Sequence, residues 1–368
     1  MKVQDVHRIM SAWAPPAIAW DRDNVGLQYG DPNARVRGIL VSLDPTEESA
    51  HEAHARGANL IVTHHPLLFR PLRSVTPASA AGRCLDLLAR GRIALYSAHT
   101  NLDFARQGTS FALAAKLGLQ DVAFLERSYR VDRKIVTFVP AESADRVAAA
   151  MAEAGAGVIG NYDHCSFRAA GMGTFRGNDA SSPAVGQKGK LERAPEVRLE
   201  MIAPQWAVDD VVRAIRRSHP YDEVAFDVLP LENTSSDFGM GAVGTLPHAM
   251  RLSRFLSHVK RTLGPGAVRW CGSPRTAVHR IALCGGSGGE LLESAIRAGA
   301  EVFLSADLKY HAFHEAAGRI ALIDAGHYET EVPVVGAIVA RLRNELRRRG
   351  ELIPVQAARR VDNFVRYV

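Results

Sequence analysis

Long apolar runs are absent from this sequence. No stretch reaches the roughly 18 consecutive apolar residues of a membrane-spanning helix, and the N-terminus lacks the basic segment and apolar run of a signal peptide. Both absences predict a cytoplasmic protein without a membrane partner. Cysteine is scarce as well, and it lacks the paired spacing of a zinc knuckle or a disulfide framework. The four cysteines stand singly, at Cys84, Cys165, Cys271 and Cys284. We expect them to be buried small apolar residues.

A concentrated charge of one sign is also missing. The net charge is +6, but the 45 Lys and Arg residues are spread along the chain and are balanced by 39 Asp and Glu residues. The one tight basic run, at 347–349, ends a predicted helix, where positive charge complements the helix dipole. The sequence therefore argues against a nucleic-acid partner.

The length and the apolar content predict two domains. At 368 residues the chain exceeds what a single hydrophobic core usually organises, and 47% apolar residues suffice for two cores. Strands and helices alternate near both ends of the chain, which is typical of layered α/β domains with parallel sheets. In the first part the predicted strands are 36–43, 59–63 and 92–97, and the helices 46–55, 78–90 and 108–117. In the last part the strands are 280–284, 301–304 and 320–324, and the helices 290–298, 310–317 and 327–348.

The middle of the chain has a different order of elements. Its predicted strands are 134–139, 165–175, 196–202 and 223–229, with helices at 143–154 and 207–218. The order strand, helix, two strands, helix, strand predicts a ferredoxin-like α+β domain. We therefore predict an inserted domain at 130–234 and a discontinuous α/β domain formed by 1–129 and 235–368.

Candidate metal ligands follow two predicted strands. His64 and His65 end the strand 59–63, and ligands of open α/β sheets gather beyond the carboxyl ends of the strands. His99 and Asp103 follow the next strand, so they are expected beside the histidine pair. Neutral imidazoles and a carboxylate suit a divalent first-row metal. Ordinary turn histidines, and a turn cap at Asp103, are the alternatives.

His327 and Glu331 lie four residues apart at the start of a predicted helix, so both side chains share one face and can hold the same ion. A surface ion pair is the alternative. Together with His64, His65 and Asp103 they form a set without a thiolate that is too large for a structural zinc. This argues for two ions or for one open catalytic ion, with zinc, iron or manganese all compatible.

Weaker signals concern the substrate. The glycine-rich segment 285–289, with Gly286 and Ser287, lies between a strand and a helix, where backbone amides can bind phosphate. It lacks the ending of a phosphate loop, so a tight structural turn is an equal alternative. Lys309 is a candidate phosphate ligand and His311 a candidate proton shuttle, unless both are solvated loop residues.

Five motifs together give a wider resemblance. They are 23–28 (DNVGLQ), 63–67 (THHPL), 99–103 (HTNLD), 306–311 (ADLKYH) and 326–331 (GHYETE). In this combination, over nearly the whole length, the chain resembles the Nif-three-like dinuclear-metal proteins, many of which are described as type-two GTP cyclohydrolase I homologues.

The resemblance implies that His64, His65, Asp103, His327 and Glu331 bind two divalent ions per subunit. It also implies a toroidal homohexamer whose metal sites face an internal cavity, and an insert similar to the P-two or CutA fold. The motifs 171–175 (GMGTF) and 219–223 (HPYDE) are the ones we associate with that insert. A departure is Glu329, an acid where some members have a small residue, which would alter metal preference.

The function implied is that of a metal-dependent hydrolase of a nucleotide or another phosphorylated small molecule. For the cyclohydrolase homologues this means hydrolytic opening of the imidazole ring of GTP with release of formate, with His99 or His311 as the proton shuttle. The alternative is a non-catalytic, metal-binding hexameric regulatory or scaffold protein that senses a small ligand.

Overall fold

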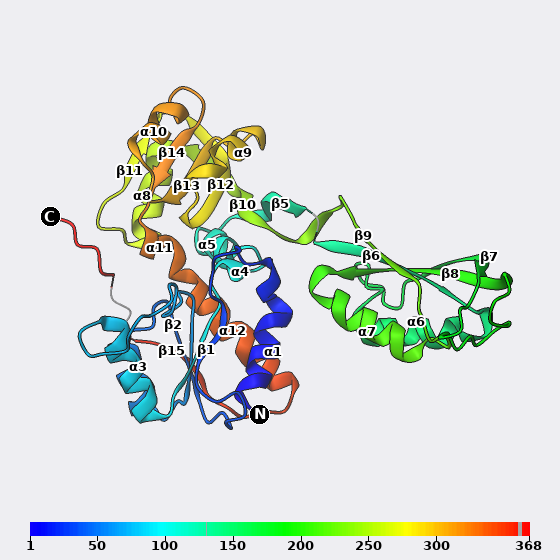
Figure 1. Cartoon of the computed structure of the whole chain (residues 1–368). Helices are drawn as coiled ribbons and strands as arrows, with labels where there is room; N and C mark the ends of the chain where they lie inside the picture. Colours follow the sequence, from blue (N-terminus) through cyan, green and yellow to red (C-terminus); the bar gives the residue numbers. More distant parts are fainter. Residues whose placement is uncertain (130, 360–362) are drawn as a thin grey trace. The chain divides into compact units, whose positions relative to one another are not determined.

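The computed structural model describes residues 1–129, 131–359 and 363–368. The chain separates into two compact units, one formed by 1–127 and 236–368 and the other by 128–235 (Figure 1). Residue 130, where we predicted the start of the insert, lies outside the described residues. In the part of the chain that is described, no helix is long and apolar enough to cross a membrane.

The first sheet of unit 1 has the strand order β1-β4-β3-β2-β15. Its strands are β1 (Gly26–Tyr29), β2 (Ile39–Ser42), β3 (Leu60–Thr63), β4 (Ala94–Ser97) and β15 (Val355–Ala357). All neighbours pair in parallel except β1, which runs antiparallel to β4 at the edge. Every residue of β2, β3 and β4 is buried, as expected for parallel strands that are covered on both faces.

Helices cover both faces of this sheet. They are α1 (Val3–Trp13), α2 (Glu47–Ala55), α3 (Ala80–Gly91) and α12 (Pro333–Arg348), with a short 3-10 helix η1 (Pro16–Ile18) after α1. Since successive strand residues point to opposite faces, Leu60 and Val62 pack with α1 and α12, whereas Ile61 packs with α2 and α3. The carboxyl ends of the buried strands are thereby left free to hold a site.

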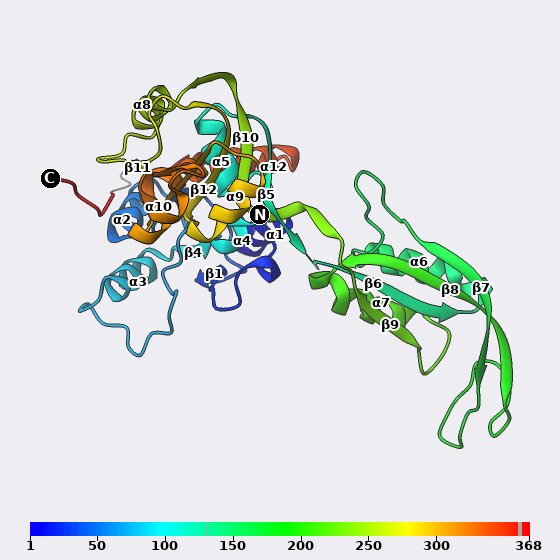
Figure 2. The ribbon, with the colours of Figure 1, turned by 90° about the horizontal axis from the view of Figure 1, so that it is seen from above.

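The second sheet of unit 1 has the order β11-β14-β13-β12-β10-β5 (Figure 1), and its strands β11, β12, β10 and β5 can also be found in Figure 2. Its strands are β5 (Gln120–Tyr129), β10 (Thr234–Arg251), β11 (Arg269–Cys271), β12 (Ala277–Ser287), β13 (Val302–Ala306) and β14 (Ala321–Asp324). The central three are parallel, β10 is antiparallel to β12, and β11 is antiparallel to β14. The α/β class is thus confirmed, but both sheets are mixed rather than purely parallel.

Helices also cover both faces of the second sheet. They are α5 (Thr109–Lys116) and α8 (Leu252–Leu263) in one core, and η4 (Gly289–Leu291), α9 (Leu292–Arg297) and α10 (Tyr310–Ala316) in the other. The predicted helix 327–348 is two helices, α11 (His327–Glu331) and α12. Pro333 occupies the first turn of α12, where its missing N–H costs nothing, so it begins a new helix.

Unit 2 contains one four-stranded sheet and two helices. Its elements are β6 (Asp132–Val139), η2 (Ala141–Ser143), α6 (Ala144–Glu153), β7 (Phe167–Phe175), β8 (Glu192–Pro204), η3 (Gln205–Ala207), α7 (Val208–Ser218) and β9 (Phe226–Pro230). The strand order is β7-β8-β6-β9, and every paired neighbour is antiparallel. Both helices share one core with β6 and β8.

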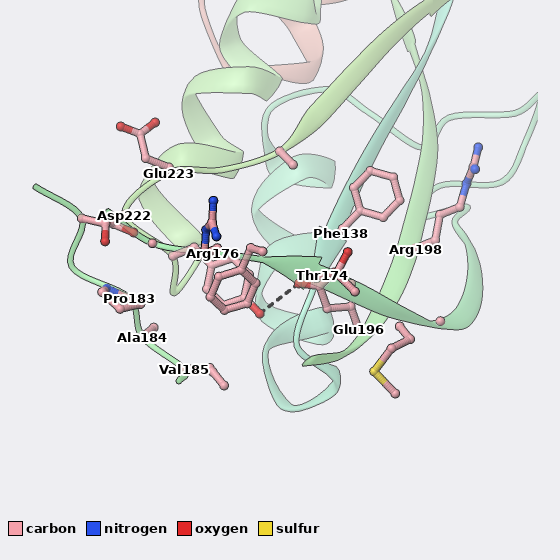
Figure 3. A pocket seen from close by; sticks show the side chains of 18 of the residues that line it. Phe138, Thr174, Arg176, Pro183, Ala184, Val185, Glu196, Arg198, Asp222 and Glu223 are labelled. Atoms are coloured by element: carbon pink, nitrogen blue, oxygen red, sulfur yellow. Dashed lines mark hydrogen bonds between the residues drawn. The ribbon is translucent and has the colours of Figure 1, made fainter. Parts of the chain in front are cut away.

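A cavity of about 830 Å³ lies between β7, the segment that follows it and the turn at 221–225 (Figure 3). Glu196 accepts a hydrogen bond of 3.0 Å from the Tyr221 hydroxyl there. Burial, together with Glu196, raises the pKa of Tyr221 to about 12. Next to it, His219 Nε2–H donates to Phe138 O at 2.9 Å, and His219 Nδ1 accepts from the Tyr221 N–H at 3.1 Å. These two bonds fix a neutral imidazole, which indicates a structural role.

Candidate metal centre

The carboxyl ends of the two sheets of unit 1 meet at the predicted ligands. His64 and His65 follow β3 directly, and Asp103 ends the short helix α4 (Thr100–Asp103) that follows β4. His327 and Glu331 begin and end α11, which follows β14 of the second sheet. Residues far apart in the sequence are thus brought to one place.

Glu331 occupies the middle of the group and is only 4% exposed. Its Oε2 lies 2.9 Å from His65 Nε2 and 3.0 Å from His327 Nε2. On the other side, His64 Nε2 lies 3.8 Å from Glu331 Oε1 and 3.6 Å from Asp103 Oδ1. Among the described residues, the possible ligand atoms form two clusters that share a histidine: His64, His65 and His99, and His65, His327 and Glu331. Asp103 belongs to neither cluster, and its connection to them is the 3.6 Å approach to His64. Each cluster has the side chains that a divalent ion requires.

Outer hydrogen bonds orient every histidine of the two clusters. The Nδ1 atom of His64 lies 2.9 Å from Ala98 O, and that of His65 lies 2.7 Å from Asp44 Oδ1. The Nδ1 atom of His99 lies 3.0 Å from Asp23 Oδ1, and that of His327 lies 2.7 Å from Asp307 Oδ2. Because all four partners are acceptors, Nδ1 carries the hydrogen and donates. In the neutral tautomer this leaves a lone pair on each Nε2, the usual arrangement of a metal-binding histidine with an outer partner.

Unpartnered polar atoms support a bound cation. In this neutral tautomer the Nε2 atoms of His65 and His327 cannot donate to Glu331, so three atoms of the group, His64 Nε2, Asp103 Oδ1 and Glu331 Oε2, are buried without a hydrogen-bond partner among the described residues. A buried polar atom left unpaired costs about 1–3 kcal/mol. Three such atoms in one group therefore need a common partner, and a divalent ion satisfies imidazole and carboxylate donors at once.

The electrostatics of the side chains agree with this interpretation. Burial alone would lower the pKa of His65, but its hydrogen bond to Asp44 and its contact with Glu331 outweigh burial and raise the pKa to about 10. In the same way Glu331 and Asp307 overcome burial and raise the pKa of His327 to about 9. Burial would raise the pKa of Glu331, yet the surrounding imidazoles hold it well below its usual value. The Glu331 carboxylate is thus stabilised in its charged form by neighbouring positive charge.

Within the motif 306–311 the residue that reaches the site is Asp307. Its φ of +56° is unusual for a residue with a side chain, and such conformations concentrate at functional sites. Lys309 instead precedes the first turn of α10 and is exposed, and His311 is exposed with its ring 5.6 Å from that of Tyr310. Neither belongs to the clusters, so their predicted roles have no geometric support.

Gly286 lies against the site for a reason other than anion binding. Its N–H donates to Thr330 Oγ1 at 3.0 Å, so it is not free for a phosphate. A Cβ at this position would come within 2.1 Å of Glu331 Oε1, and φ is +66°. Only glycine fits here. Ser287 is exposed and pairs with Ala306 at the end of β12.

Glu329 lies outside both clusters. It is 5% exposed, and its Oε1 accepts a hydrogen bond of 2.9 Å from Asn363 Nδ2. Its carboxylate therefore has a partner in the C-terminal segment rather than a place among the metal ligands.

Sequence analysis missed the two outer carboxylates Asp23 and Asp44. Asp44 comes two residues after the end of β2, the strand beside β3 in the sheet, and that position was a usable signal. Asp23 begins the motif 23–28, to which we had assigned no function. It also accepts hydrogen bonds from the backbone N–H and the hydroxyl of Thr100, and its side chain is 1% exposed.

Comparisons with known proteins agree with these observations. Residues 1–360 match the family model Duf34/NIF3 (NGG1p interacting factor 3). The chain is 37% identical over 331 residues to a "GTP cyclohydrolase 1 type 2 homolog" of Bacillus subtilis, and the aligned region covers 89% of each protein. It is also 37% identical over 363 residues to the protein of that name from Mycobacterium tuberculosis, covering 97% of this chain and 94% of the relative.

A solved structure has the same fold. The Bacillus cereus protein related to NIF3 superposes with a TM-score of 0.83 at 34% identity, over 100% of this chain and 99% of that one. The Staphylococcus aureus protein SA1388 gives a TM-score of 0.80 at 28% identity, with the same coverage. The resemblance drawn from the five motifs is confirmed, and the chain belongs to the Duf34/NIF3 family.

Proposed function

We propose that the chain is a metal-dependent hydrolase of a nucleotide or another phosphorylated small molecule. Two divalent ions, zinc, iron or manganese, are held by His64, His65, Asp103, His327 and Glu331. The observation that carries this proposal is the set of imidazole Nε2 atoms turned toward buried carboxylates, each imidazole being fixed by an outer acceptor. Two relatives named as GTP cyclohydrolase 1 type 2 homologues support GTP as the first substrate to test.

The ligand chemistry explains why a hydrolase is favoured over a structural metal site. Nitrogen and oxygen donors without thiolate are typical of catalytic ions, whereas structural zinc sites are usually closed by cysteine. Two divalent ions close together lower the pKa of water toward neutrality and stabilise negative charge on the reacting group. The exposure of the side chains differs across the site. The side chain of Glu331 is 5% exposed and that of His64 is fully buried, whereas that of His327 is 39% exposed. The site is therefore accessible to solvent at His327.

His99 is the residue best placed to move a proton. Its ring lies 5.3 Å from that of His64 and 5.6 Å from that of His65. Asp23 accepts the Nδ1–H, so Nε2 is the atom that gives or takes a proton. His311 stays a second candidate from the sequence, which His311→Ala tests below, and Lys309 and Ser287 stay candidates for the phosphate.

The proposal extends to unit 2 and to assembly. We propose that unit 2 is a ferredoxin-like insert at 130–234, because its elements follow the order strand, helix, two strands, helix, strand in an antiparallel sheet. A similarity to P-two or CutA proteins, a cytoplasmic location and a homohexameric ring are parts of the same proposal. They rest on the sequence motifs, and sedimentation of the purified protein tests the ring.

The deciding experiment measures formate release from GTP by protein reconstituted with zinc, manganese or ferrous iron. Metal-dependent release that is lost in His64→Ala supports the proposal. His311→Ala should keep the activity if His99 is the shuttle. No release with any of the metals overturns GTP as the substrate. If Glu331→Gln then loses assembly or thermal stability along with its metal, the regulatory or scaffold alternative is the correct one.

A further inference from the structure

Besides the cavity of unit 2, the structure has a cavity of about 900 Å³ in unit 1. It lies between the segment that contains the motif 23–28 and the loop 66–77 that follows His65. None of the residues predicted from the sequence to bind substrate lines it.

The cavity opens beside the candidate metal centre. Asp23 and Phe69 both line it, and both contact His99. The Asp23 carboxylate lies 3.0 Å from His99 Nδ1, and the Phe69 ring lies edge-to-face on the His99 ring with centroids 6.0 Å apart. Since the other side of His99 faces His64 and His65, one imidazole separates the cavity from the metal ligands.

The motif 23–28 fixes the loop that carries Phe69. Asn24 Nδ2 donates to Leu68 O at 2.7 Å. Gln28 Oε1 accepts from the backbone N–H groups of Leu67 and Leu68 at 2.8 and 3.0 Å. These bonds hold the backbone of the two residues that precede Phe69, so the aromatic ring is positioned in advance of any ligand.

Phe69 stays 49% exposed in spite of this anchoring. Two aliphatic side chains of the same loop are exposed as well, Leu72 by 41% and Val75 by 59%. A half-exposed aromatic ring on a fixed loop, with aliphatic neighbours, provides a surface for a planar apolar ring.

The charges of the cavity favour an anion. Arg22 and Arg70 line it and have no hydrogen bond or ion pair among the described residues. The two lining carboxylates are both engaged, Asp23 with His99 and Asp86 with Arg90 at 2.8 Å. Free guanidinium groups beside engaged carboxylates match a phosphate, which Arg binds in a bidentate manner.

We propose that this cavity binds a nucleoside phosphate, with its base against Phe69 and its phosphate at Arg22 and Arg70. The inference rests on the proposed function in one respect. If the metal centre is catalytic, this cavity is its substrate pocket, and the bound molecule lies next to His99. The pocket itself needs no metal, because Phe69, Arg22 and Arg70 lie outside both ligand clusters.

The test is binding of GMP by the full chain, measured by isothermal titration calorimetry with and without zinc. Stacking of a base on an aromatic ring contributes about 1–3 kcal/mol, so Phe69→Ala should weaken GMP binding about tenfold or more, and Phe69→Tyr should retain it. Arg70→Gln should weaken GMP binding by a similar factor and leave guanosine binding unchanged. Zinc content should stay at the wild-type level in all three variants.

The matched control is Arg90→Gln, since Arg90 lines the same cavity but is paired with Asp86. Its GMP affinity should stay within about twofold of wild type. Equal GMP affinity in wild type, Phe69→Ala and Arg70→Gln overturns the inference, even if GTP hydrolysis is found. If GMP binding depends on these residues while no metal restores hydrolysis, the pocket stands and the hydrolase proposal fails.

Discussion

The outer hydrogen bond of His65 offers a sharp test of the metal centre. Asp44 Oδ1 accepts from His65 Nδ1 at 2.7 Å, and both side chains are largely buried, with 24% and 21% exposed. Asp44→Asn keeps the shape of the side chain and an acceptor oxygen but removes the negative charge. The imidazole then becomes a weaker ligand and is held less firmly.

The expected loss can be given a magnitude. Substituting an outer partner of a metal-binding histidine typically lowers metal affinity about 10- to 100-fold. This corresponds to about 1.4–2.8 kcal/mol, since each factor of ten is about 1.4 kcal/mol. The assay is competition for zinc between the protein and a chelator of known affinity, at pH 7.5 and constant ionic strength.

The control is Asp145→Asn, which removes an equal charge from unit 2. The Asp145 side chain is 92% exposed and pairs with Arg168 at 2.6 Å, outside both clusters. Zinc affinity should be unchanged in this variant. If Asp44→Asn is folded and binds zinc within twofold of wild type, then His65 is not a ligand that Asp44 orients, and the proposed ligand set is wrong.

Three further outcomes are expected. Gly286→Ala should reduce zinc binding at least tenfold, because the added Cβ would lie 2.1 Å from Glu331 Oε1. The control Gly299→Ala has a similar φ of +69° but open space around the added Cβ, so its zinc binding should be unchanged. Metal analysis after dialysis checks both variants. Burial lowers the pKa of His219, so the unfolded chain binds the proton more tightly, and the free energy of unfolding should decrease as the pH is lowered below about 6.5. Urea unfolding at pH 7.5 and 5.5 should show a smaller decrease of this free energy in His219→Gln than in the wild type. Glu329→Gln should leave the zinc-to-manganese affinity ratio unchanged, since Glu329 lies outside both clusters; a shifted ratio would restore it as a determinant of metal preference.

The buried parallel strands were the predictable part of the fold. β3 and β4 consist of four buried residues each, and the chain places its histidines directly after them. Such a strand has a clear apolar signal and a defined end, so its polar neighbours can be assigned to the sheet edge. The antiparallel strand β10 carries a weaker signal, because its exposed residues alternate irregularly with buried ones, and the three-residue edge strand β11 has no buried residue.

The outer partners were not predictable from local pattern. Asp44 lies 21 residues from His65, Asp307 lies 20 from His327, and Asp23 lies 76 from His99. Each partner follows a different strand or turn, and only the assembled sheets bring it to its histidine. An isolated acid in a loop is otherwise a common turn or cap residue, so spacing alone cannot separate the two roles.

The glycine at position 286 is required for close packing, whereas the sequence had suggested phosphate binding as one of two explanations. A glycine-rich turn between strand and helix is compatible with a phosphate site and with close packing, and the sequence holds nothing that decides between them. The decision comes from Glu331, which reaches Gly286 because α11 follows β14, a strand of the same sheet as Gly286, and ends at Glu331. The glycine makes room for the Glu331 carboxylate, so the need for glycine at this position follows from packing and from its positive φ.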